Sequence, residues 1–455
     1  MEDVDASGLV DLLPDGVVTT DADAIEKYRF DRSQDPRTGT PVAVVRAEDA
    51  DQVQAAVRWA AEHRVPVVPR GAGSGLSGGS SALDGGIVLS LERMRDVEID
   101  PVCQVAVVEP GAFNAEVKAA AAEHGLWYPP DPSSYEFCSI GGNVATNAGG
   151  LCCVKYGVTT DYVLGLDVVL ADGTLVTLGG KTIKDVAGLS LMKLFVGSEG
   201  TLGIVTRAIL RLVPAQSARS TLVATFDSSK VAAEAVVAIR SRLRPSMLEL
   251  MDQGSIRAVE AHRHMGLDTD AGALLVAQSD APGSSCSEEI AFMEEACRGA
   301  GATEVFTTDD ADEGEMFVQA RRMVIPSVEE IGTLMLEDVG VPVPRLPELL
   351  EAVAGIAARH DLSIPVIAHA GDGNTHPLVV VPRGDADGPE RARVAFDEIM
   401  QAAIRLDGTI TGEHGVGRTK KGPLPDQLGP EVMALTRRIK DALDPDGILN
   451  PGAIL

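Results

Sequence analysis

A glycine-rich loop near the start of the chain constrains the fold more than any other stretch. Residues 69–80 read PRGAGSGLSGGS, with five glycines within the nine positions 71–79. The loop directly follows an apolar segment, residues 65–69, that we expect to be a buried strand. Such a loop exposes consecutive backbone N–H groups and allows them to approach a phosphate closely. It therefore predicts a nucleotide cradle.

The same loop argues against a Rossmann-type nicotinamide site. Gly73, Gly75 and Gly78 match the GxGxxG spacing, but a Rossmann site requires the third glycine to open an amphipathic helix. Here Gly78 is followed by more glycine and serine and then by the expected strand 87–91. We therefore expect backbone donors alone, without a helix, to hold a pyrophosphate.

The remaining pattern predicts an α+β chain of two or three domains, since 455 residues exceed one ordinary core. Residues 129–160 lack periodicity, and an irregular stretch of that length is usually functional. Residues 214–220 (PAQSARS) have the composition of a linker, and the segments after them predict helices on an antiparallel sheet. Expected strands are 41–46, 65–69, 87–91, 105–108, 164–170, 175–178, 201–213, 221–226, 246–252, 273–278, 363–368 and 377–381; expected helices are 49–64, 113–124, 228–242, 285–299, 313–323, 346–360, 389–405 and 430–442.

Charge and composition exclude several classes of function. The formal net charge of −28 disfavours binding to nucleic acid and to anionic lipid. No apolar run reaches the length of a membrane span, and the acidic N-terminus lacks the pattern of a signal peptide, so we expect a cytoplasmic protein. The six cysteines form no CxxC pair and predict no disulfide framework.

Three histidines lie in glycine-rich loops instead of on helices. His369 and His376 flank the turn AGDGNT between two expected strands, which can fold both imidazoles toward one point. A third, His414, follows Glu413 in the loop GEHGVG. Two imidazoles and one carboxylate form a site for a borderline metal that leaves positions open for a substrate.

Together these motifs resemble the flavoprotein family of vanillyl-alcohol oxidase and para-cresol methylhydroxylase. The nearest branch contains D-lactate dehydrogenase, glycolate oxidase and D-2-hydroxyglutarate dehydrogenase. The resemblance covers nearly the whole chain. It rests on RGAGSGLSG (70–78), PDPSS (130–134), IGGNVATNAGG (140–150), KYG (155–157), GSEGTLGIVT (197–206), HAGDGNTH (369–376), GEHGVG (412–417) and NPG (450–452).

The resemblance implies an FAD-binding domain of the para-cresol methylhydroxylase type and an α+β cap domain. The first would span 1–215, in subdomains of about 1–110 and 111–215; the cap would span 216–410, and 411–455 would return to the first domain. The residues it implies around FAD are Arg70, Gly71, Ala72, Gly73, Ser74, Gly75, Leu76, Ser77, Pro130, Asp131, Ser134, Gly141, Gly142, Asn143, Thr146, Asn147, Gly150, Tyr156, Gly157, Glu199, Gly200, Gly203, Ile204, Val205 and Asn450.

Attachment of the flavin is expected to be noncovalent. Some relatives attach FAD through a histidine of the first glycine loop, whereas this sequence has no histidine between His63 and His124. Others use a cysteine near the second glycine segment. Cys138 stands at that point and leaves a thioether open as the alternative, beside the simpler interpretation of a small buried thiol.

The resemblance also implies a reaction: oxidation of a small D-2-hydroxy acid, of the D-lactate or glycolate type. His369, His376 and Glu413 would ligate a divalent metal, often zinc, and His414 would accept the hydroxyl proton. Arg321 would bind the substrate carboxylate, with Arg322 and Arg345 as weaker candidates.

Other features of that reaction stay open. The electron acceptor would be a quinone, a cytochrome or another flavoprotein, or oxygen if the protein is an oxidase. A flavin-bearing subunit of a larger electron-transfer complex is a further alternative. The three cations Arg418, Lys420 and Lys421 follow the catalytic loop and are expected at the surface.

Overall fold

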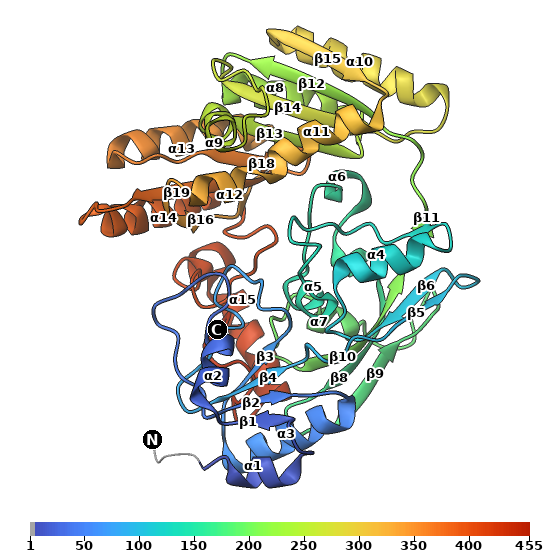
Figure 1. The fold of residues 1–455 in the computed structure, drawn as a ribbon, viewed down its shortest axis with the longest axis vertical. Helices are drawn as coiled ribbons and strands as arrows, with labels where there is room; N and C mark the ends of the chain where they lie inside the picture. The colour runs from blue at the N-terminus through green and yellow to red at the C-terminus, as the bar shows by residue number, and fades with distance from the viewer. Residues whose placement is uncertain (1–4) are drawn as a thin grey trace. The chain divides into compact units, whose positions relative to one another are not determined.

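The chain forms two units, neither of which is continuous in sequence (Figure 1). The computed structural model describes residues 5–455. The first unit combines Met1–Gly149, Val158–Ala215 and Glu413–Leu455, and the second combines Gly150–Gly157 with Gln216–Gly412. Each unit is described by itself below.

A small sheet in the first unit carries the glycine loop. Its order is β1 (Val18–Thr19), β2 (Ala43–Arg46), β4 (Ile87–Ser90) and β3 (Val67–Arg70), with β2 and β3 both parallel to β4. The loop joins β3 directly to β4, and no helix stands between them, as predicted. Around this sheet lie α1 (Ser7–Leu12), α2 (Ala22–Arg29) and α3 (Ala50–His63).

Helix α3 has the capping residue and the apolar face that its sequence predicts. Asp49 caps its first turn by accepting from the N–H of Gln52, and Arg64 ends it in the left-handed conformation. The predicted apolar face is buried against the sheet, with Val53, Ala56 and Val57 fully enclosed.

The first unit also contains a five-stranded antiparallel sheet. Its order is β5 (Val97–Asp100), β6 (Val105–Val108), β10 (Ile204–Arg211), β8 (Val163–Val169) and β9 (Leu175–Gly179), and the predicted hairpin joins β8 to β9. A shorter pair is formed by β7 (Leu126–Trp127) and β11 (Val213–Pro214). The helical pieces of this part are α4 (Asn114–Ala122), α5 (Ile140–Thr146), the short 3-10 turn Thr159–Asp161 and α7 (Met192–Phe195).

The helix α5 corrects one expectation. Residues 140–146 fall within the stretch 129–160, whose composition and lack of periodicity predict irregular structure, and Gly141 and Gly142 are poor helix formers. They are helical because Ser139 caps the first turn and Asn147 ends the last turn in the left-handed conformation. Capping residues therefore outweigh the poor helix propensity of two glycines.

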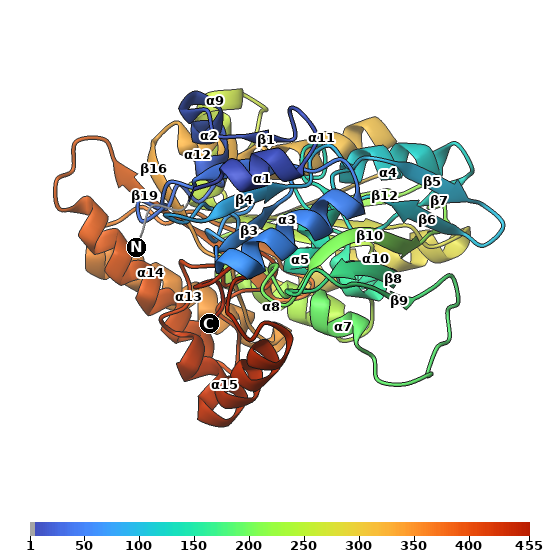
Figure 2. The ribbon, with the colours of Figure 1, turned by 90° about the horizontal axis from the view of Figure 1, so that it is seen from below.

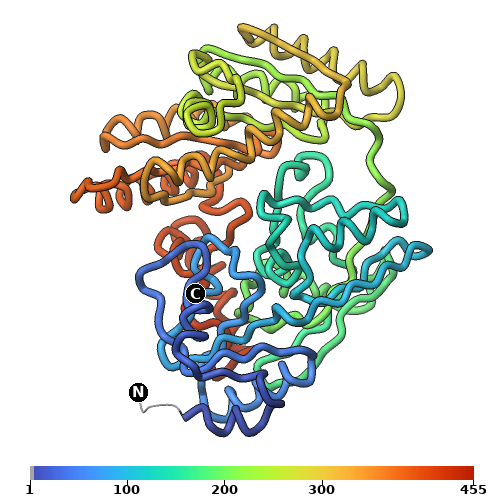
Figure 3. Tube along the Cα trace, viewed as in Figure 1, coloured from blue at the N-terminus to red at the C-terminus, as the bar shows by residue number. Residues whose placement is uncertain are grey.

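The C-terminal stretch returns to the first unit and lies among its N-terminal elements, red beside blue in Figure 3. The N–H of Val67 donates to the carbonyl of Ile448, and the N–H of Asn450 donates to the carbonyl of Val67, both at 2.8 Å. Helix α15 (Leu424–Leu443) precedes this contact and is interrupted at Gly429, just before Pro430.

An eight-stranded sheet, antiparallel at every pairing, forms the second unit. Its order is β15 (Glu304–Thr308), β12 (Ser220–Phe226), β14 (Ala273–Ser279), β13 (Met247–Asp252), β18 (Val366–His369), β19 (Asn374–Pro382) and β16 (Gly332–Leu336), with β17 (Val339–Gly340) on β19. The predicted α+β class and antiparallel second sheet are thus confirmed.

The helices of the second unit are α6 (Cys153–Tyr156), α8 (Ser229–Arg240), α9 (Gln253–Arg263), α10 (Ser284–Ala300), α11 (Ala311–Arg322), α12 (Val324–Glu329), the 3-10 turn Val343–Arg345, α13 (Leu346–His360) and α14 (Gly388–Arg405). Helices α13 and α14 pack side by side (Figure 2). Over residues 5–455, no helix is both long enough and apolar enough to cross a bilayer.

Candidate functional site

The first glycine loop packs closely against Arg70, the last residue of β3. Arg70 is 8% exposed and donates from Nη1 to the carbonyl of Ser80 at 3.3 Å. A Cβ added to Gly73, whose φ is +70°, would lie 2.1 Å from Nη2 of Arg70. The glycine is therefore required for both its conformation and the close approach of the guanidinium.

The second glycine segment lies against the first through a serine hydroxyl. Oγ of Ser139 accepts from the N–H of Ala72 at 3.2 Å and from the N–H of Gly142 at 3.4 Å. A Cβ on Gly71 would come within 2.1 Å of the same oxygen. The two predicted segments are therefore brought together by Ser139, which the sequence analysis did not single out.

Asn114 joins two more predicted segments and was also missed. Its fully buried side chain donates from Nδ2 to the carbonyl of Pro130 at 3.2 Å and to Oδ1 of Asn143 at 3.0 Å. Nearby, Oδ1 of Asn147 accepts from the N–H of Thr160 at 2.8 Å. These amides fix the shape of the segment 130–157, which carries many of the residues implied around FAD.

Asn450 and Glu199 connect the glycine loop to the C-terminal segment within the first unit. Nδ2 of Asn450 donates to the carbonyl of Gly79 at 2.8 Å and to that of Glu199 at 2.7 Å. The Glu199 carboxylate accepts from the N–H groups of Val416 and Gly417, each at 2.8 Å. The loop after His414 is thereby attached to the same framework as the glycine loop.

Burial raises the pKa of Glu199 to about 7, from an ordinary value of 4.5, although the two N–H donors oppose the shift. In the folded protein the group keeps its proton between these values, whereas the unfolded chain loses it. The stabilising contribution of Glu199 is therefore complete below about pH 4.5 and is lost as the pH rises through 7.

We expect Glu199→Gln to remove this pH dependence, because the amide does not titrate. The free energy of unfolding of the parent protein relative to the variant should fall by up to about 3 kcal/mol between pH 4.5 and 7.5. Urea denaturation at several pH values measures the difference. Parallel pH profiles for the two proteins would contradict this assignment.

Other residues implied around FAD have a clear packing role. A Cβ on Gly200 would lie 2.3 Å from Cγ of Pro69, and one on Gly203 would lie 2.5 Å from Cγ1 of Val168. Ile204 begins β10 and is buried in the core. At these positions, glycine permits the turn to pack closely against neighbouring strands.

Gly150, Tyr156 and Gly157 belong to the second unit, although the preceding residues belong to the first. Asp280 accepts from the hydroxyl of Tyr156 and from Nζ of Lys155, and its carboxylate also accepts from Nε2 of Gln216 at 2.9 Å. This carboxylate thus anchors the segment of residues 150–157 to the second unit.

The two predicted metal histidines lie on adjacent strands of the second unit. His369 ends β18, His376 lies in β19, and the turn between them contains Gly373 with φ +85°. Each residue is 3% exposed, and the ring centroids are 5.1 Å apart. The glycine turn therefore brings both imidazoles together, as predicted.

The Nδ1 atom of each imidazole faces an acceptor. His369 Nδ1 lies 2.8 Å from Oε1 of Glu249, and His376 Nδ1 lies 3.3 Å from the carbonyl of Glu337 and 3.8 Å from Oδ1 of Asp338. With the Nδ1 proton held in this way, the nitrogen through which each ring would coordinate a metal is Nε2.

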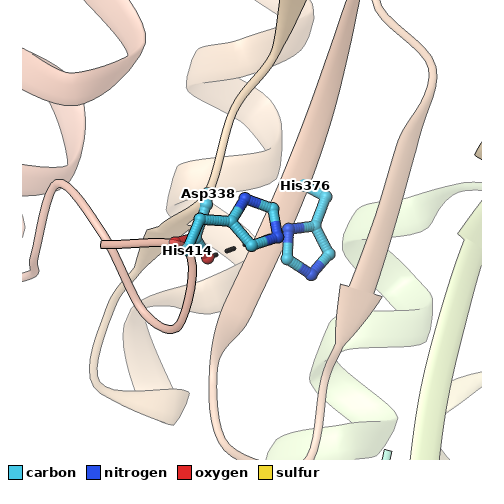
Figure 4. A group of neighbouring side chains, drawn as sticks. All are labelled: Asp338, His376 and His414. Carbon is cyan, nitrogen blue, oxygen red and sulfur yellow. Dashed lines mark ion pairs between the residues drawn. The ribbon is translucent and has the colours of Figure 1, made fainter. Parts of the chain in front are cut away.

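Asp338 fixes the loop that leads to Glu413 and His414. Its buried carboxylate accepts from Nδ2 of Asn374 at 3.0 Å, from Oγ1 of Thr411 at 2.6 Å and from the N–H of Gly412 at 3.0 Å. Glu413 is the next residue along the chain. Figure 4 shows Asp338 beside His376 and His414, with the ion pair between Asp338 and His376 dashed.

Two overlapping groups have ligand atoms close enough for one ion. In the first, atoms of His369, His376 and Glu413 all lie within 4.8 Å of one another, and in the second, atoms of Asp338, His376 and His414 do so. The first group is the predicted set. Because Asp338 already accepts three hydrogen bonds that hold the loop, the first group is the better candidate for a metal.

Each of the three arginines that were candidates for the substrate carboxylate lies beside a glutamate. Nε of Arg321 forms an ion pair with Oε2 of Glu249 at 3.0 Å, and Arg321 is 2% exposed. Nη1 of Arg322 lies 3.6 Å from Glu315, and Nη1 of Arg345 lies 3.1 Å from Glu348. Arg321 is thus the most deeply buried of the three candidates.

The expectation that Arg418, Lys420 and Lys421 lie at the surface is wrong for the first two. Arg418 donates to the carbonyls of Gly78 and Ser81 and to Oδ1 of Asn450, and Lys420 is 1% exposed. They are covered because the C-terminal segment packs onto the glycine loop. Local sequence could not indicate this, since Arg418 lies more than 300 positions from Gly78 and Ser81.

Two known families match this chain. Residues 41–179 match the family described as "FAD binding domain", and residues 215–454 match "FAD linked oxidases, C-terminal domain". The two matches do not overlap, and the second begins within the linker-like segment 214–220.

Curated relatives cover nearly the full length. The chain is 42% identical to "Glycolate oxidase subunit GlcD" of Bacillus subtilis, over 90% of this chain and 88% of the relative. It is 34% identical to a D-lactate dehydrogenase of Archaeoglobus fulgidus, over 94% of this chain and 96% of the relative.

Among solved structures, p-cresol methylhydroxylase with substrate bound superposes with a TM-score of 0.83. The two share 18% sequence identity, and the match covers 98% of this chain and 95% of the other. At that identity the likeness concerns the fold.

Proposed function

The chain belongs to the FAD-linked oxidase family, in the branch of the glycolate oxidase subunit and D-lactate dehydrogenase, and we propose that it oxidises a small D-2-hydroxy acid to the 2-oxo acid with FAD. D-lactate and glycolate are the proposed substrates. As a family member it is an FAD-dependent oxidoreductase, which the resemblance in its motifs had implied.

One observation carries the choice of reaction: ligand atoms of His369, His376 and Glu413 lie within 4.8 Å of one another. This donor set of two imidazoles and a carboxylate fits a divalent ion, with zinc as our first choice, and leaves room for substrate oxygens. A bound metal would act as a Lewis acid on the substrate hydroxyl. Glu413 and the two histidines would hold it there.

His414 is the proposed acceptor of the hydroxyl proton. An imidazole suits this role because its ordinary pKa lies near neutrality. Ser77 donates from Oγ to the backbone carbonyl of His414 at 3.1 Å, and Glu199 holds the two N–H groups that follow Gly415. These bonds fix the backbone on the C-terminal side of His414.

Arg321 is the proposed partner of the substrate carboxylate. Its Nε is engaged by Glu249, so the substrate would meet the opposite edge, formed by Nη1 and Nη2. A guanidinium held on one edge is already oriented before the substrate binds. One such arginine suits a monocarboxylate better than a dicarboxylate.

The flavin is proposed to bind without a covalent bond. The two glycine segments joined by Ser139 would supply backbone N–H groups to a pyrophosphate. The flavin, when bound, would accept the hydride. The alternative attachment through Cys138 has little support. That thiol is 3% exposed, lies 3.3 Å from Nδ2 of Asn143, and burial raises its pKa, so the nucleophilic thiolate is disfavoured.

A place in a larger assembly is the second candidate. The name of the Bacillus subtilis relative describes it as a subunit of glycolate oxidase. This chain would then carry the flavin step and pass electrons to a partner chain, whereas a protein that works alone would use a quinone, a cytochrome or another flavoprotein. Copurification of a partner chain distinguishes the two.

Turnover of a panel of 2-hydroxy acids with an artificial electron acceptor tests the proposed reaction. We expect activity with D-lactate or glycolate, weaker activity with L-lactate and D-2-hydroxyglutarate, and release of free FAD on acid precipitation. Absence of turnover with every acid, in a protein that holds its flavin, would contradict the substrate class.

A further inference from the structure

One glutamate of the second unit contacts both a proposed metal ligand and the proposed substrate-binding arginine. Glu249 lies within β13, and 1% of its surface is exposed. Its Oε1 and Oε2 lie 2.8 and 3.0 Å from Nδ1 of His369, and Oε2 also lies 3.0 Å from Nε of Arg321. The three side chains come from β13, β18 and α11.

The charges and hydrogen-bond donors of Arg321, Glu249 and His369 complement one another. A carboxylate buried this deeply is costly unless it is paired and hydrogen-bonded, and Arg321 supplies the positive charge. His369 then donates its Nδ1 proton to the same carboxylate, which sets the ring tautomer and leaves the lone pair on Nε2. Glu249 therefore determines both the orientation and the tautomer of the imidazole.

The second histidine is held differently. Nδ1 of His376 faces the backbone carbonyl of Glu337, and the Asp338 carboxylate is 3.8 Å away. Glu249, by contrast, contacts both His369 and Arg321 through the same oxygen. A single carboxylate thus connects His369 to the arginine.

We propose that Glu249 is a positioning residue that couples the metal site to the substrate-carboxylate site. This coupling rests on the proposed function, because both sites belong to that reaction. Through Glu249, His369 is oriented toward the metal and Arg321 toward the substrate. A change at Glu249 should therefore weaken metal binding and substrate binding together, although Glu249 itself touches neither.

Glu249→Gln tests the coupling. The amide removes the negative charge that pairs with Arg321. Because both carboxylate oxygens lie within 3.0 Å of Nδ1 of His369, the amide also places an N–H group against the Nδ1 proton whichever way it turns. We expect zinc affinity, measured by competition with a chelator, to fall about 10- to 100-fold, the usual effect of losing the acceptor behind a ligating histidine. The KM for the 2-hydroxy acid should rise as well, while the flavin content stays unchanged.

Asp252→Ala is the control, because alanine removes the helix-capping oxygen that asparagine would keep. Asp252 ends the same strand and is a partly buried carboxylate, but it caps α9 by accepting from the N–H of Ser255 at 2.8 Å. Its replacement should lower the thermal stability and leave the zinc affinity and KM unchanged. A general weakening of the fold would instead affect both variants alike.

Arg321→Lys keeps the test decisive if Glu249→Gln folds poorly, and the double variant measures the coupling if Glu249→Gln folds. Lysine keeps the charge but loses the Nε contact, so zinc affinity should fall although Arg321 is not a ligand. In the double variant the two losses should not add, as expected for residues acting through one contact. Additive losses would overturn the coupling.

The possible failures are distinguishable. If the parent protein binds zinc and Glu249→Gln binds it equally well with the same KM, the positioning role is wrong while the proposed function stands. If the parent protein binds no divalent metal and still oxidises the acid, the metal-assisted reaction is wrong and the role of Glu249 falls with it.

Discussion

Replacement of His414 by alanine should slow reduction of the bound flavin by at least about 100-fold, the usual scale for loss of a general base. The side chain of His414 is 14% exposed, and its backbone is held by Ser77. Without the imidazole, no group at that position accepts the hydroxyl proton as the hydride leaves. Stopped-flow mixing with D-lactate or glycolate under anaerobic conditions measures the rate.

His360→Ala is the control for this variant. His360 ends α13 and pairs with Glu398 at 3.0 Å, within the second unit and outside the proposed site. Its loss should leave flavin reduction at the parent rate. A His414→Ala protein that reduces its flavin as fast as the His360→Ala protein would place the base elsewhere.

Removal of the metal should have an equal or larger effect. A Lewis acid on the reacting hydroxyl contributes several kcal/mol to the transition state, so its loss should reduce turnover by about 1,000-fold or more. His369→Ala and His376→Ala should do the same, since each removes one of three ligands. The flavin spectrum should persist, because the glycine segments that hold FAD lie outside the ligand set.

Readdition of zinc to the chelated parent protein should restore turnover, while the histidine variants should stay inactive at the same zinc concentration. Metal content per chain, measured alongside activity, connects the two effects. Full activity in a protein shown to contain no divalent metal would refute the assignment of His369, His376 and Glu413.

Much of the fold was accessible from sequence because its signals are local. Helix α3 has both a cap at Asp49 and an apolar face at 3.6-residue spacing, and the hairpin of β8 and β9 has an Asp-Gly turn. Helix α5 was not predicted because its two glycines have poor helix propensity, whereas Ser139 and Asn147 stabilise its ends. Local propensity and capping disagree there, and capping prevails.

The candidate site divides in the same way. His369 and His376 could be paired from sequence because they are only seven positions apart, with a glycine turn between them. Glu249 could not be found, since it is a single acidic residue in a strand and lies 120 positions from His369. Asp338, 74 positions from Gly412, and Asn114, 29 positions from Asn143, escaped for the same reason.

Anaerobic mixing of the purified holoprotein with a 2-hydroxy acid tests the central claim most directly. We predict that D-lactate or glycolate bleaches the flavin absorbance and yields one equivalent of the 2-oxo acid per flavin. A flavin that stays oxidised with every 2-hydroxy acid of either hand, but is readily bleached by a chemical reductant, would contradict the claim.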